Sequence, residues 1–95
     1  MTPNDISIHA AHAKSQATLM EFLRADIELA FTFMRTAEIE AASDPEHCQA
    51  ALAKVRAAVD TVRRLEGQIE DPEIGLTLRS RTDELEAALA GWERR

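Results

Sequence analysis

The chain has 95 residues, of which 45% are hydrophobic and 29% charged, and these values fit one folded domain rather than a disordered segment. Its formal net charge is −6, and none of the segments 1–42, 43–67 and 68–95 has a basic excess. This balance disfavours electrostatic binding to nucleic acid or to an anionic membrane. A single cysteine excludes an intrachain disulfide, and no run of about 18 apolar residues predicts a transmembrane helix.

The composition also indicates the class of fold. Ala, Leu, Glu and Arg are abundant, whereas the chain has 3 Gly, 3 Pro and no Tyr, which favours helices over strands. The first residues lack a basic stretch followed by an apolar core, so no secretory signal is expected. We therefore predict an all-α protein and expect it in the cytoplasm.

Residues 1–18 are predicted to form an N-terminal helical arm that is partly frayed. After Pro3 this segment contains no Gly or Pro, so nothing stops a helix before the next segment begins. An arm of this length would extend about 24 Å beyond a bundle of matched helices at 1.5 Å per residue. Because such a helix is marginal alone in water, we expect it to fray, bend back or pack against another molecule.

The segment from about 19 to 42 is predicted to be the first helix of a bundle spanning residues 19–95. Apolar residues spaced alternately by 3 and 4 predict one coiled-coil-like seam: Met20, Leu23, Ile27, Ala30, Met34, Ala37 and Ala41. Phe22, Leu29 and Phe33 form a second line that widens the apolar arc to roughly 200°. Two interpretations of this line stay open: a wide core face that contacts both other helices, or a surface for self-association.

Two Asp-Pro-Glu sequences predict where the other helices begin. Asp44 and Asp71 suit the N-cap, and the proline that follows each suits the first helical position. We predict helix 2 at about 45–66, ended by Gly67 as a left-handed C-cap, and helix 3 at about 72–93. The connection after 42 is short, so helix 2 must turn back. The predicted seams are Cys48, Leu52, Val55, Val59 and Val62 in helix 2, and Gly75, Leu78, Thr82, Leu85, Leu89 and Trp92 in helix 3.

These elements predict an antiparallel up-down-up three-helix bundle with a long first helix. By counting from the connections, Trp92 falls level with Ala37 and Ala41, so it is expected to cap the core near Cys48. Arg81 falls within about one turn of Asp26, which predicts an ion pair between helices 1 and 3.

Few residues are candidates for metal binding or catalysis. Asp5, His9 and His12 share one face of a helix and are candidates for binding a metal such as Zn²⁺, for which a closed site needs a fourth ligand. The other interpretation is that the seam turns polar along the arm. His47 and Cys48 point about 100° apart on a helix, so Cys48 is expected to be a buried thiol rather than a nucleophile. We find no phosphate-binding loop or catalytic pair, and we expect neither a cofactor nor enzyme activity.

The function favoured by these observations is a protein–protein interaction or assembly module that acts through helix 1. Its partner would be another protein or a second copy in a homodimer. The expected interface is Phe22, Leu29 and Phe33, with Ile6, Ile8 and His12 contributed by the arm. Two alternatives are a signalling or metal-sensing protein that uses His9 and His12, and an acidic inhibitor of a basic partner, which a charge of −6 permits.

Overall fold

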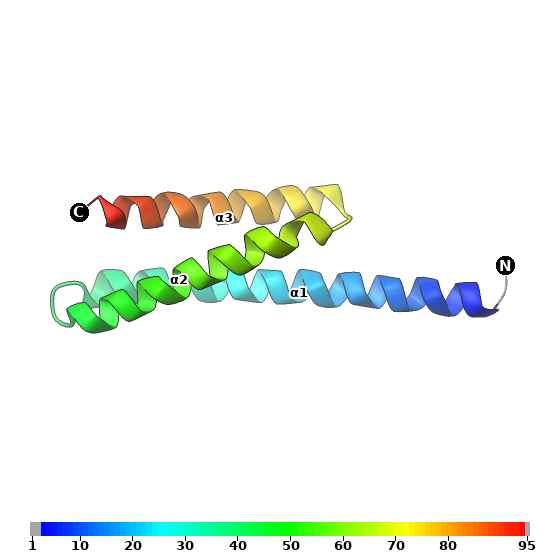
Figure 1. The fold of residues 1–95 in the computed structure, drawn as a ribbon, viewed down its shortest axis with the longest axis horizontal. Helices are drawn as coiled ribbons and strands as arrows, with labels where there is room; N and C mark the ends of the chain where they lie inside the picture. The colour runs from blue at the N-terminus through cyan, green and yellow to red at the C-terminus, as the bar shows by residue number, and fades with distance from the viewer. Residues whose placement is uncertain (1–2, 95) are drawn as a thin grey trace.

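The computed structural model describes the backbone of residues 3–94 and the side chains of residues 9–94. Within that range the chain forms α1 (Pro3–Glu40), α2 (Pro45–Leu65) and α3 (Pro72–Glu93), with a 3₁₀ turn at Glu66–Gln68. The helices run up, down and up in a rod of 62 × 20 × 15 Å (Figure 1). The predicted all-α three-helix bundle with a long first helix is confirmed.

Helix α1 joins the predicted arm and the predicted first helix without a break. Its 38 residues form one helix, and the N-terminal part projects past the turn between α2 and α3 (Figure 1). The helix ends at Glu40, where the carbonyl accepts a hydrogen bond from the Asp44 N–H at 2.8 Å and closes the turn into α2. The backbone of the predicted arm therefore continues the first helix of the bundle without interruption.

Local capping explains where α2 and α3 begin. The Asp44 carboxylate accepts from the His47 N–H at 3.0 Å, and the Asp71 carboxylate accepts from the N–H groups of Glu73 and Ile74 at 3.0 and 3.1 Å. These bonds satisfy N–H groups that have no partner inside the helix. Both predicted N-caps are confirmed.

The predicted left-handed cap at Gly67 is wrong. No residue in the described range has a positive φ, and Gly67 instead lies in the 3₁₀ turn that follows α2. The Glu66 N–H bonds to the Val62 carbonyl, and the Ile69 N–H bonds to the Glu66 carbonyl at 3.1 Å. Tightening the last turn satisfies the final carbonyls without a left-handed residue.

The core follows the predicted seams, except that Met20, Ala41 and Trp92 are only partly buried. Its buried residues are Leu23, Ile27, Ala30, Met34 and Ala37 of α1, Cys48, Ala51, Leu52, Val55, Ala58, Val59 and Val62 of α2, and Gly75, Leu78, Thr82, Leu85 and Leu89 of α3. The buried Thr82 hydroxyl donates to the Leu78 carbonyl at 2.7 Å, so the core contains no unpaired hydroxyl there. Trp92 is half-buried and packs against this core near the end of α3. That end lies beside the turn between α1 and α2 (Figure 1).

The predicted ion pair between Arg81 and Asp26 is wrong. Arg81 of α3 binds the Glu28 carboxylate at 2.5 Å, and its guanidinium lies over the Phe31 ring at 4.3 Å from the centroid. Two residues along a helix differ by about 200° in direction, so Asp26 and Glu28 cannot face the same neighbour. Because α3 packs on the side of Glu28, Asp26 is left on the side of α2.

A charged cluster joins α2 to α3. Arg63 donates to Glu86 at 2.9 Å, and it also pairs with Asp83 and with Glu66. The hydrogen bond from Arg63 holds the pKa of Glu86 below its usual value. Since the cluster is partly exposed, it fixes how α2 and α3 align more than it adds stability.

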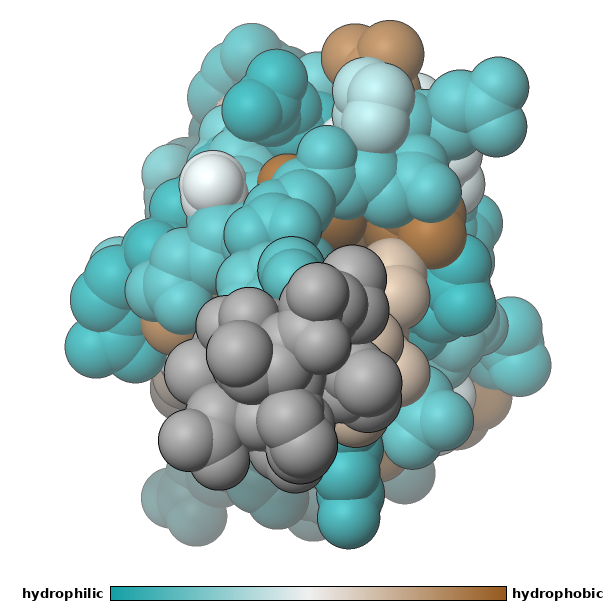
Figure 2. Space-filling model, turned by 90° about the vertical axis from the view of Figure 1, so that its right-hand side faces the viewer, coloured by the Kyte–Doolittle hydropathy of each residue, from teal (hydrophilic) through white to brown (hydrophobic). Residues whose placement is uncertain are grey.

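Figure 2 shows the molecule from the N-terminal end, where hydrophilic residues predominate among the coloured atoms and small apolar patches lie between them. Among residues 3–94, no helix combines the length and the hydropathy needed to cross a membrane.

Candidate interaction surface

The outer stripe of α1 consists of Phe22, Asp26, Leu29 and Phe33, spaced by 4, 3 and 4 residues. Phe22 is 50% exposed and Leu29 is 51% exposed, whereas Phe33 is half-buried and packs against the core. The two sequence interpretations therefore apply to different residues. Phe33 widens the core face toward α2, and Phe22 and Leu29 remain on the surface.

A shallow depression of about 180 Å³ lies between the outer stripe and α2. Leu29 and Phe33 line it on α1, and Ala57 and Ala58 line it on α2. The Lys54 ammonium, also part of the lining, lies 4.8 Å from the centroid of the Phe33 ring. This depression continues the apolar surface of α1 onto α2.

Asp26 is the one carboxylate within the outer stripe. It is half-buried, and burial raises its pKa above the usual aspartate value. No described residue forms a hydrogen bond or ion pair with it. Removing a carboxylate from water without a partner costs free energy. The position of Asp26 therefore indicates a surface that another group covers.

The same face of α1 continues along the arm with small side chains. Ala11, Ser15 and Thr18 lie in line with Phe22 and Leu29, at spacings of 4, 3, 4 and 7 residues. Together they border a broad, shallow depression of about 610 Å³, which we call the arm hollow. Its lining is Ala11, Lys14, Ser15, Thr18, Leu19 and Phe22. The outer face of α1 thus carries small side chains along the arm and large side chains at Phe22 and Leu29.

The opposite face of the arm is held by the turn between α2 and α3. The Gln16 amide donates to the Gln68 carbonyl at 2.9 Å and accepts from the Glu70 N–H at 3.1 Å. One turn earlier, His12 Nε2 lies 2.7 Å from the Glu70 carboxylate. The sequence pattern placed His12 on the polar continuation of the core seam but did not predict that the turn would bind His12 and Gln16. The continuing seam was the available signal.

The metal candidates on the arm are not gathered into a site by the described residues. His12 contacts Glu70, His9 is exposed, and the Asp5 side chain lies outside the described range, as do those of Ile6 and Ile8. Among the described side chains, one group of three possible metal ligands lies within 4.8 Å of one another: Glu40, Asp44 and His47. Asp44 already caps α2 there, so its carboxylate has a structural role in this group.

Cys48 is a buried thiol, as predicted. It is 3% exposed in the α2 seam, while the neighbouring His47 is exposed and lies 4.0 Å from Glu40. The thiol has neither access to solvent nor His47 as an adjacent base, so its arrangement does not suit nucleophilic catalysis.

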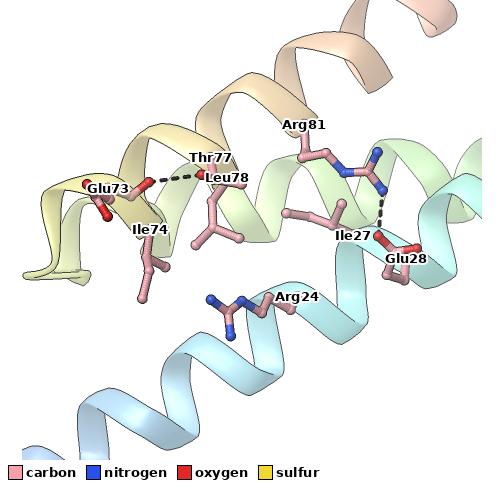
Figure 3. A pocket seen from close by; sticks show the side chains of 8 residues that line it. All are labelled: Arg24, Ile27, Glu28, Glu73, Ile74, Thr77, Leu78 and Arg81. Carbon is pink, nitrogen blue, oxygen red and sulfur yellow. Dashed lines mark hydrogen bonds and ion pairs between the residues drawn. The ribbon is translucent and has the colours of Figure 1, made fainter.

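A groove of about 430 Å³ separates the start of α3 from α1 (Figure 3). Ile27, Ile74 and Leu78 provide its apolar surface, and the ion pair between Arg81 and Glu28 crosses one end. The lining residues include no histidine or cysteine, and the one hydroxyl, on Thr77, is donated to the Glu73 carbonyl at 3.0 Å. The groove suits apolar contact and offers no nucleophile with a base.

Comparison of the chain with protein-family models, curated proteins and solved structures gives no significant match. The geometry of the outer face of α1 is therefore the basis for the functional proposal.

Proposed function

We propose that this protein is a non-enzymatic assembly module that binds other protein chains through the outer face of α1. The observation that carries the proposal is the pair of large apolar side chains, Phe22 and Leu29, each half-exposed on one helix face. Single exposed apolar residues are common, but an aligned pair continuous with the half-buried Phe33 forms a patch of the kind used in protein contacts.

The energy available from this face is sufficient for weak to moderate association. Complete burial of a Phe or Leu side chain contributes about 1.5–3 kcal/mol, so covering the exposed half contributes about 1 kcal/mol for each residue. A two-fold contact would double that sum, because each chain would bury the same two residues. Further contacts along the helix must then offset the entropy lost on association.

Other properties of the chain suit this role in a reducing compartment such as the cytoplasm. The one cysteine is a buried free thiol, so the chain has no disulfide that a reducing compartment would break. A net charge of −6 favours protein partners over nucleic acid.

The proposal is tested by measuring mass in solution by light scattering over about a hundredfold range of concentration. The variants are Phe22→Glu and Leu76→Glu, since Leu76 is 63% exposed on α3 and serves as the matched control. We expect the wild type and Leu76→Glu to gain mass with concentration, and Phe22→Glu to stay a folded monomer. A wild type that keeps the monomer mass throughout, or equal loss of mass in both variants, would contradict assembly through this face.

A further inference from the structure

The partner of the outer face can be specified further if the proposed assembly role holds. We propose that it is a second copy of this chain, with the two α1 helices antiparallel across a two-fold axis level with Met20. In this arrangement the arm hollow of each copy receives Phe22 and Leu29 of the other copy.

The register follows from the sizes of the side chains along the outer face. Ala11, Ser15, Thr18, Phe22, Ala25 and Leu29 are spaced by 4, 3, 4, 3 and 4, which is the spacing of a coiled-coil seam. With the axis level with Met20, two facing residues have numbers that sum to 40. Phe22 then faces Thr18, Leu29 faces Ala11, and Ala25 faces Ser15. Each large side chain meets a small one, so the helices can approach closely.

The surface relief of the monomer agrees with this register. The arm hollow has a volume of about 610 Å³ and is bordered by Ala11, Ser15 and Thr18, which are the residues that would face Leu29, Ala25 and Phe22. Phe22 and Leu29 of each copy would therefore enter the hollow of the other copy. A two-fold axis makes the two contacts identical.

The arm hollow favours this register over the one shifted by half a heptad. Moving the axis so that facing numbers sum to 47 would place Phe22 opposite Ala25, outside the hollow. The segments that face each other also differ in charge: residues 9–18 carry Lys14 and no acidic side chain, whereas residues 22–31 carry Asp26 and Glu28 against Arg24.

The arm supports a second copy as the occupant because the pairing covers it. Residues 3–37 of one copy would lie along residues 37–3 of the other, a length of about 52 Å at 1.5 Å per residue. The turn between α2 and α3 binds the arm through Gln16 on its opposite face, so the outer face stays open. The projecting part of α1 would thereby gain the neighbour that it lacks in the monomer (Figure 1).

The test uses a double cysteine variant, Ser15→Cys with Ala25→Cys, in a Cys48→Ala background whose solution mass is first shown to match the wild type. The two new thiols lie about 15 Å apart along one helix, so they cannot bond within a chain. Across the proposed dimer, position 15 faces position 25 twice. We expect mild oxidation of the native protein to give a covalent dimer.

Three control variants test other arrangements of the two α1 helices. Ser15→Cys alone and Ala25→Cys alone place like thiols about 15 Å apart in the proposed dimer, so neither should crosslink. Ser15→Cys with Thr32→Cys matches the register in which facing numbers sum to 47, and it should not crosslink either. Crosslinking of a single variant would show a parallel pair or an antiparallel pair whose axis passes through that position, and crosslinking of the 15/32 pair would show the shifted register.

Either of those results, with a wild type that is dimeric by light scattering, would overturn the register and leave the assembly role standing. A dimeric wild type in which none of the cysteine variants crosslinks would also overturn this α1 pairing. A wild type that is monomeric over the whole concentration range would contradict both proposals.

Discussion

Removal of the Gln16 amide should loosen the contact between α1 and the turn that joins α2 to α3. In the native structure this one side chain makes two hydrogen bonds to the turn backbone, at 2.9 Å to the Gln68 carbonyl and at 3.1 Å from the Glu70 N–H. Substitution by Ala deletes both bonds, and water can replace them only in part because Gln16 is half-buried.

The size of the effect follows from the number of bonds. A neutral hydrogen bond contributes about 0.5–1.5 kcal/mol net, and the lower end applies here because the turn is exposed to water. Two bonds therefore predict a loss of about 1 kcal/mol in the free energy of unfolding. For a domain of this size that loss lowers Tm by about 4–8 °C.

Thermal unfolding of Gln16→Ala, followed by far-UV circular dichroism at a fixed low concentration, measures the loss. Gln49→Ala is the matched control, because Gln49 is exposed on α2 and the change in helix propensity is the same. Hydrogen exchange should also show faster exchange of the Glu70 amide in Gln16→Ala. Equal Tm values for the two variants, with unchanged exchange at Glu70, would refute this account of the turn.

Three further predictions concern charge and packing. Arg63 lowers the pKa of Glu86 in the folded state, so its stabilisation is present above the ordinary pKa of 4.5 and is lost as pH falls through the folded-state value. Glu86→Gln should cost at most about 1 kcal/mol near pH 7 in urea unfolding, and its difference from wild type should vanish in acid. The pKa of Asp26 is raised, so this carboxyl favours folding below 3.8 and loses that contribution as pH rises through its folded-state value. Asp26→Asn should therefore raise the Tm of dilute protein near pH 7 and leave it unchanged near pH 3; a lower Tm near pH 7 would contradict the burial argument. Leu85→Ala should cost about 2–5 kcal/mol in urea unfolding because Leu85 is fully buried, while Leu76→Ala should cost less than about 0.5 kcal/mol; similar values for both would argue against this core.

The starts of α2 and α3 and most of the core could be predicted from local sequence. Each start depends on an Asp side chain that bonds to an N–H two or three residues later, with a proline between them, so the cause lies within a few residues. The buried seam of α2 repeats at 4 and 3 residues, and that periodicity alone specifies which face of a helix enters a core.

The way the faces of α1 are divided between α2, α3 and solvent depends on how the helices pack and could not be predicted from local sequence. Phe33 packs inward while Phe22 and Leu29 stay exposed, although all three lie on one predicted line. Arg81 pairs with Glu28 rather than Asp26. These outcomes depend on the direction from which α2 and α3 approach α1, which periodicity does not encode.

The end of α2 and the role of the arm were decided in the same way. Gly67 suits a left-handed cap by its residue type, but the short connection to α3 is met by a 3₁₀ turn. That turn then presents backbone groups to Gln16, a residue 52 positions away from its acceptor at Gln68. Contacts at such a separation depend on the axial offset of packed helices, so they arise only when the whole bundle is assembled.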